Sequence, residues 1–109
     1  MNIPRWTPDA MHDQVATGVP VLVDLRADWC SQCEPQEQVL DRLLAEYTGT
    51  VTLGSVDVGV HPDIPDRYGV LGLPSFLLFT GGELRQVLNG YKRAPELRQA
   101  LRDLLHQQA

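Results

Sequence analysis

Two cysteines three positions apart, Cys30 and Cys33, are the residues of this chain best suited to do chemistry. They are its only cysteines, and they stand between an apolar run at residues 19–25 and a segment with helical periodicity. At the start of a helix, thiols with this spacing lie close enough to form a disulfide, and the unpaired N–H groups and positive dipole end favour a thiolate. A thiolate attacks disulfides, whereas a thiol does not. The pair therefore predicts reversible dithiol–disulfide chemistry.

Two other uses of the cysteine pair stay open at this point. A purely structural disulfide would close too short a loop to add much stability. Structural zinc takes about four protein ligands, and none of His12, His61 and His106 has ligand spacing to the cysteines. A metal shared across a dimer is the remaining metal alternative. Because the chain also lacks a phosphate-binding glycine loop, we predict no metal and no cofactor besides the redox-active disulfide.

Length, charge and hydropathy limit the class of protein. A chain of 109 residues predicts one domain, residues 1–109, whose core does not need a covalent staple. The net charge of −5 is spread along the chain, which disfavours nucleic acid and anionic membranes as partners. No apolar run approaches the roughly 18 residues of a membrane span, and the N-terminus lacks a signal-peptide core. We expect a soluble, monomeric, cytoplasmic protein, in which such a cysteine pair is more often catalytic or metal-binding than structural.

Strands and helices alternate around the cysteines. The nearly all-apolar run at residues 19–25 is typical of a strand buried on both faces, and residues 36–47 carry the single apolar stripe of a helix. Further strands are predicted at residues 51–58, 75–79 and 83–88, and further helices at residues 8–17, within 61–69, and at 95–106. The paired glycines at 81–82 predict a hairpin between the last two strands. The pattern indicates an α/β protein with a parallel core and an antiparallel hairpin.

The order of these elements and several local motifs resemble thioredoxins along nearly the whole chain. The motifs are Val23-Asp24, Ala27-Asp28-Trp29-Cys30 with Cys33, Val56-Asp57-Val58, Tyr68-Gly69-Val70, Gly72-Leu73-Pro74-Ser75, Phe79 ahead of Gly82, and Asn89-Gly90. The resemblance implies the thioredoxin fold, a central mixed β-sheet flanked by helices on both faces. It also implies a thiol–disulfide oxidoreductase that reduces protein disulfides and receives electrons from an NADPH-dependent flavoprotein reductase.

Within this family pattern, the two thiols and one acid have distinct expected roles. Cys30 should be the exposed nucleophile that forms a mixed disulfide, and Cys33, one turn inward, should resolve it. Asp24 lies in an apolar strand, where burial raises the pKa of a carboxyl group. The resemblance matches Asp24 to the acid that moves a proton to or from the resolving thiol. The alternative is a carboxyl satisfied by backbone or water, and Ser55 stands where the family often has a lysine near this acid.

Five residues are predicted to form a substrate groove beside the dithiol: Trp29, Gly72, Leu73, Pro74 and Gly90. Trp29 is expected both to fill core and to present a partly exposed face to partners. The resemblance implies a cis bond before Pro74, with the Leu73 main chain bonding an extended substrate segment. Gly72 and Gly90 either let a substrate backbone approach closely or serve only as turn residues.

Several residues near the cysteines depart from the family pattern. Ser31 and Gln32 replace the common Gly-Pro dipeptide and should tune the reduction potential. Gln32 adds a backbone N–H that can stabilise the thiolate, whereas Asp28 and Glu34 oppose a thiolate by their charge. Arg26, at a position usually aromatic in the family, either offsets these acids or points to solvent.

One further departure lies in the long helix. Gln38 stands where thioredoxins commonly have a helix-kinking proline, so we expect a straighter helix. Together these departures motivate an alternative function, a binding module or redox sensor dedicated to one partner with little general turnover. An oxidant or isomerase is a third reading, which would need an oxidising compartment.

Overall fold

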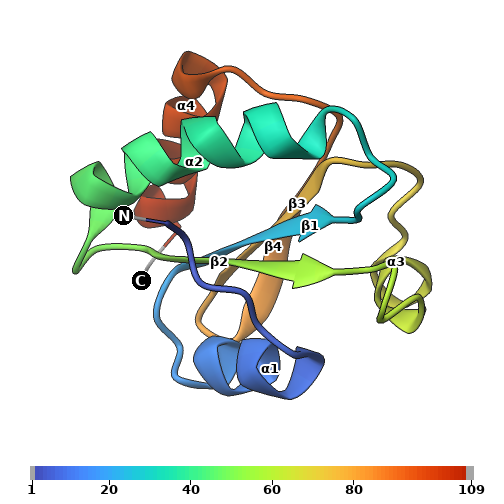
Figure 1. The fold of residues 1–109 in the computed structure, drawn as a ribbon. Helices are drawn as coiled ribbons and strands as arrows, with labels where there is room; N and C mark the ends of the chain where they lie inside the picture. Colours follow the sequence, from blue (N-terminus) through green and yellow to red (C-terminus); the bar gives the residue numbers. More distant parts are fainter. Residues whose placement is uncertain (1, 108–109) are drawn as a thin grey trace.

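A four-stranded mixed β-sheet forms the centre of the computed structural model, which describes residues 2–107 (Figure 1). The strands are β1 (Val21–Arg26), β2 (Thr52–Asp57), β3 (Ser75–Thr80) and β4 (Glu83–Asn89). The helices are α1 (Pro8–Ala16), α2 (Cys33–Tyr47), α3 (Asp63–Tyr68) and α4 (Ala94–His106). The strand order is β2-β1-β3-β4, with β1 and β2 parallel and the other two pairs antiparallel. The predicted thioredoxin-type sheet with helices on both faces is confirmed.

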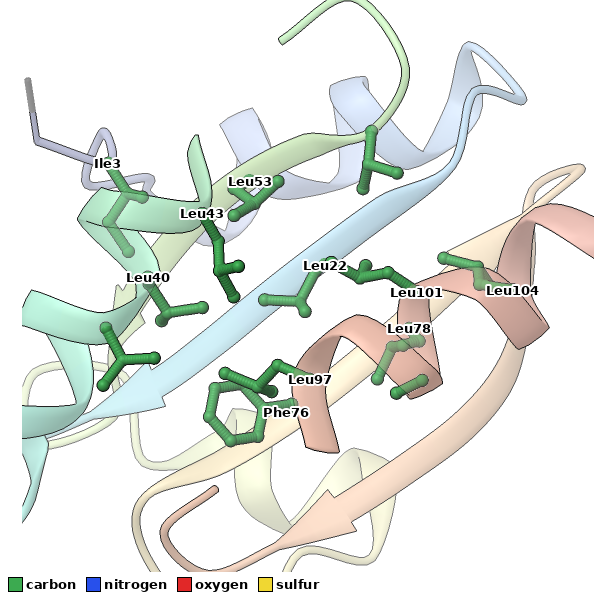
Figure 2. Packing of buried hydrophobic residues seen from close by; sticks show 13 residues of the cluster. Ile3, Leu22, Leu40, Leu43, Leu53, Phe76, Leu78, Leu97, Leu101 and Leu104 are labelled. Atoms are coloured by element: carbon green, nitrogen blue, oxygen red, sulfur yellow. The ribbon is translucent and has the colours of Figure 1, made fainter. Parts of the chain in front are cut away.

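Alternate residues of β1 pack into two separate apolar clusters on opposite faces of the sheet. Leu22 packs with residues of α2 and α4, whereas Val23 and Leu25 pack with residues of α1 and α3. Figure 2 shows the first cluster, in which Leu40 and Leu101 approach the sheet from the two helices. Because successive side chains of a strand alternate between faces, Asp24 and Arg26 belong to the α2 side together with Leu22.

Local sequence signals account for several helix ends. The side-chain oxygen of Thr7 accepts a hydrogen bond from the Ala10 N–H at 3.1 Å and so caps α1. Gly69 ends α3 in the left-handed conformation, with φ of 68°. Helix α2 begins at Cys33, three residues earlier than its apolar stripe predicts, because Pro35 in the first turn is compatible with a helix. It then continues unbroken for 15 residues, through Gln38.

The N-terminal segment adds an edge to the sheet that the sequence patterns do not predict. Trp6 N–H donates to the Ser55 carbonyl at 2.7 Å, and Ser55 N–H donates to the Pro4 carbonyl at 2.9 Å. Arg5 thereby lies directly opposite Ser55 in a short parallel bridge on the outer side of β2. The indole of Trp6 covers Gly54, where any side chain would collide with the ring. Trp6 is therefore a packing residue.

Candidate functional site

The two cysteines lie between the end of β1 and the start of α2 and are joined by a disulfide, with a Cα–Cα distance of 5.4 Å. Cys33 is the first residue of α2 and is fully buried, whereas Cys30 lies in the preceding turn and is half-buried. The Cys30 N–H donates to the Ala27 carbonyl at 3.1 Å, and the Cys33 N–H donates to the Cys30 carbonyl at 3.2 Å. The chain thus presents one sulfur outward and keeps the other inside, the arrangement expected of an attacking and a resolving thiol.

Two adjoining hollows lie beside the disulfide. The dithiol hollow, about 270 Å³ in volume, is lined by Trp29, Cys30, Ser31, Gln32 and Leu73. The apolar hollow, about 210 Å³, is lined by Trp29, Val58, Pro65, Val70, Leu71, Gly72 and Leu73. Trp29 and Leu73 belong to both, so the two form one continuous surface. Trp29 is 74% exposed and Leu71 is 94% exposed, which is unusual for large apolar side chains. The expectation that Trp29 also fills core is therefore wrong, and its exposed face is what remains of that prediction.

The structure places the predicted groove residues in two groups. Trp29, Gly72 and Leu73 line the hollows. Pro74 is buried, follows a cis peptide bond as predicted, and accepts a hydrogen bond from the Gly90 N–H at 2.8 Å. Gly90 has a φ of 87°, which favours glycine, so its turn role is supported by its own backbone. A side chain at Gly72 would meet no atom of the described chain within 4 Å, so its surroundings do not require glycine.

Asp24 is fully buried on the face of the sheet that α2 covers. Neither carboxyl oxygen has a hydrogen-bond partner among the described residues, which disfavours the alternative of a carboxyl satisfied by backbone. The pKa of Asp24 is raised to about 8, mainly by burial and also by the negative charge of Glu37, while the positive charges of Arg26 and Arg5 oppose the shift. Ser55 lies directly opposite on β2 and leaves the carboxyl without the neighbouring cation that the family often has. Asp24 is therefore largely protonated at neutral pH.

Arg26 is buried at the end of β1 and does not point to solvent. Its Nη1 atom lies 3.1 Å from Asp57 Oδ2, and its Nη2 atom lies 3.1 Å from Asp28 Oδ1. Its Nε atom lies 3.0 Å from Glu37 Oε1, although the N–H is not aligned for a hydrogen bond. The guanidinium therefore offsets the negative charge of Asp28, which is the first of the two alternatives that the sequence left open for Arg26. It also connects the end of β1 to the end of β2 and to α2.

Two polar side chains of α2, those of Gln36 and Glu37, have structural roles that the sequence patterns do not predict. Gln36 is fully buried, and its side chain donates to the Lys92 carbonyl at 2.9 Å and accepts from the Lys92 N–H at 2.7 Å. Glu37 contacts both Arg26 and Arg5. Helical spacing was the available signal, because Glu37 lies four residues after Cys33 and so shares its side of α2. Both residues tie the helix behind the dithiol to other parts of the fold.

Residues 2–107 contain no group of three or more His, Cys, Asp and Glu side chains arranged to hold a metal ion. Over the same residues, none of the helices combines the length and the apolar character needed to cross a membrane.

Comparison with known proteins identifies the family. The family model named Thioredoxin matches residues 3–103. A thioredoxin from Thiocapsa roseopersicina is 37% identical over 84 residues, covering 76% of this chain and 92% of the other. A thioredoxin from Alicyclobacillus acidocaldarius is 33% identical over 98 residues, covering 89% and 93%.

Solved structures agree on the fold. A mutant thioredoxin from Halobacterium salinarum NRC-1 superimposes with a TM-score of 0.84 at 24% identity, covering 94% of this chain and 89% of the other. Oxidised mitochondrial thioredoxin 3 from Saccharomyces cerevisiae gives 0.83 at 24% identity, covering 93% and 94%. With the disulfide pair at the end of β1, these matches show that the chain belongs to the thioredoxin family and is a thiol–disulfide oxidoreductase that reduces protein disulfides.

Proposed function

We propose that the substrates are disulfides in extended segments of other proteins, bound along the dithiol hollow and the apolar hollow. The observation that carries this proposal is the continuity of the two hollows through Trp29 and Leu73, next to the half-buried Cys30. An extended segment lying across Leu73 can form main-chain hydrogen bonds there, in the manner of strand addition. Its apolar side chains can be received around Leu71.

The proposed reaction has two exchange steps. The Cys30 thiolate attacks one sulfur of the substrate disulfide, forms a mixed disulfide, and releases the other sulfur as a thiolate that takes a proton from solvent. The Cys33 thiol then loses its proton and attacks the Cys30 sulfur, which releases the second substrate sulfur as a thiolate that also takes a proton from solvent. The substrate gains two electrons and two protons, and the Cys30–Cys33 pair becomes the disulfide seen in the structure.

Asp24 is the proposed proton carrier for Cys33. Both residues are fully buried, and Asp24 lies on the side of the sheet covered by α2, where Cys33 begins the helix. In its ionised form Asp24 can accept the Cys33 proton during substrate reduction. In its protonated form it can return a proton to the Cys33 thiolate when the disulfide is reduced again. A pKa of about 8 keeps both forms accessible near neutral pH.

We further propose that an NADPH-dependent flavoprotein reductase supplies the electrons and that the protein works as a monomer in the cytoplasm. Family membership supports the donor class, and consumption of NADPH in a mixture of reductase, this protein and insulin tests it. Sedimentation of the oxidised protein tests the oligomeric state. Fractionation of intact cells, followed by immunodetection of the protein in each fraction, tests the compartment.

Reduction of insulin by dithiothreitol, followed as turbidity, tests the main proposal. The wild-type protein should accelerate precipitation, and the Cys30→Ser and Cys33→Ser variants should give only the dithiothreitol background. A wild-type rate equal to that background would overturn the proposal.

A further inference from the structure

A row of polar residues crosses one end of the sheet beneath α2. Asp24 of β1 lies directly opposite Ser55 of β2, and Ser55 lies directly opposite Arg5 of the N-terminal segment. Residues directly opposite one another on neighbouring strands project to the same face of a sheet. The side chains of Asp24, Ser55 and Arg5, which we name the polar row, therefore all lie on the α2 side.

Apolar residues border the polar row on its β3 side. On the other side of Asp24, the opposite residue on β3 is Phe76, and the residue opposite Phe76 on β4 is Leu88. Phe76 is fully buried in the apolar cluster under α2 and α4 (Figure 2). A proton on Asp24 has no polar group to move to in that direction within the described sheet. Among the residues directly opposite Asp24 on the neighbouring strands, the polar one, Ser55, lies on β2.

At that edge, α2 places an acid between the row and solvent. Cys33, Glu37 and Asp41 are spaced four residues apart and share one side of the helix. Glu37 lies 3.0 Å from Arg26 and 3.7 Å from Arg5, and its side chain is 20% exposed. It lines the β2-edge hollow, a polar hollow of about 120 Å³ whose lining residues are Asn2, Ile3, Arg5, Glu37 and Asp41. Glu37 thus contacts Arg5, the outermost residue of the polar row, and is partly open to solvent.

We propose that Glu37 is the proton outlet of Asp24, passing protons between the buried carboxyl and solvent at the β2 edge. This inference rests on the proposed function, in which Asp24 gains and loses one proton in each cycle. In the outward direction Asp24 gives its proton through the Ser55 position to the Glu37 carboxylate, and Glu37 gives it to water in the β2-edge hollow. No electrons move, and Asp24 is left ionised, ready to accept the proton of Cys33.

The polar atoms of the row suit such a transfer. Within residues 2–107, neither of the Asp24 oxygens nor the Ser55 hydroxyl has a hydrogen-bond partner, and together they offer three oxygen atoms, the usual number of partners for one buried water. A hydroxyl both donates and accepts, so it can pass a proton along. The charged groups that face Asp24 are Arg5, Arg26, Glu37 and Asp41.

Among those four groups, Glu37 is the suitable acceptor. The two arginines stay protonated and cannot take a proton. Asp41 Oδ1 accepts the Ile3 N–H at 2.9 Å and so holds the N-terminal segment. Glu37 remains, with one carboxylate held between two guanidiniums and open to the β2-edge hollow.

A single-turnover experiment tests the outlet. Reduced protein is mixed at pH 7 with a synthetic peptide that contains one disulfide, and formation of the Cys30–Cys33 disulfide is followed by rapid alkylation and mass spectrometry. Glu37→Gln should slow this oxidation by about tenfold, because removing a proton-transfer group costs at least this much when the transfer limits the rate. Added imidazole should restore the rate by carrying protons into the hollow. Glu37→Asp should stay within about twofold of wild type.

Matched variants separate a proton outlet from a structural role. Glu46→Gln makes the same change on the same helix, at an exposed pair with Arg98, and should leave the rate and its imidazole response unchanged. Ser55→Val fills the row with an apolar side chain without touching an ion pair, and should slow oxidation even if Glu37→Gln does not fold.

The results distinguish failure of the proton outlet from failure of the proposed function. A wild-type rate for Glu37→Gln or for Ser55→Val would overturn the outlet, and so would a slowed Glu37→Gln rate that imidazole does not restore. If the wild-type protein itself fails to oxidise with the peptide and fails to reduce insulin, the proposed function fails instead.

Discussion

The buried carboxyl of Asp24 predicts that the oxidised protein becomes less stable as pH rises. The pKa of Asp24 is about 8 in the folded protein and near 3.8 in an unfolded chain. Between these values the folded state holds more protons than the unfolded state, so the free energy of unfolding falls as pH rises from about 4 to about 8. Below about pH 4 both states are protonated, and this effect is absent.

The Asp24→Asn variant removes the ionisation and isolates this effect. One pKa unit corresponds to about 1.4 kcal/mol. At pH 5 the variant should exceed wild type in unfolding free energy by about 2 kcal/mol, and at pH 7 by about 4 kcal/mol. Asp24 makes no hydrogen bond within the described residues, so the substitution removes no partner that would offset this gain.

Urea unfolding of both proteins, without reductant so that the disulfide stays intact, measures the difference in their unfolding free energies from pH 4 to pH 9. The exposed Asp13→Asn variant of α1 is the matched control and should show no such pH-dependent difference. A difference between Asp24→Asn and wild type that is constant over this pH range would refute the reasoning, because it would mean that Asp24 titrates alike in both states.

Three further predictions concern the surroundings of the dithiol. Arg26→Met should lower the unfolding free energy by about 3 kcal/mol, because it leaves the partly buried Asp57 and Glu37 without their cation. Arg98→Met, at an exposed pair, should lower it much less, and equal losses would contradict the burial argument. Gln36→Leu should cost about 2 kcal/mol and speed hydrogen exchange at the Lys92 amide, since both Lys92 backbone groups lose their partner. Leu71→Ser should raise KM for insulin several-fold and leave kcat unchanged; an effect on kcat alone would exclude Leu71 from substrate binding.

The helices, the strands and the deeper burial of Cys33 relative to Cys30 could be predicted because their signals are local. An apolar run of strand length, an apolar helical stripe and paired glycines each lie within one short segment. The strand at 19–25 is observed at Val21–Arg26, and its end shifts because Arg26 is buried by partners that the local pattern does not reveal. Asp57 and Glu37 lie 31 and 11 positions away along the chain, and only the folded sheet brings them to the guanidinium.

The parts of the site that the sequence patterns missed depend on contacts between distant segments. The bridge of Arg5 to Ser55 involves a segment too short to show any periodicity. An apolar stripe does not mark Gln36, because the residue is polar, although its side-chain amide bonds the backbone of Lys92, 56 residues away. Glu37 has the helical spacing to Cys33 in the sequence, but its link to the polar row needs the register of β1, β2 and the N-terminal segment.

Intact-mass measurement of mixed disulfides tests most directly the assignment of Cys30 as the attacking thiol and Cys33 as the resolving thiol. Reduced Cys33→Ser and reduced Cys30→Ser are each mixed with a short disulfide-containing peptide, and the peptide adduct is followed over time. Because Cys30 is half-buried and Cys33 is fully buried, Cys33→Ser should rapidly gain one peptide and Cys30→Ser should gain almost none. Adducts that form equally fast on both variants, or faster on Cys30→Ser, would contradict the account.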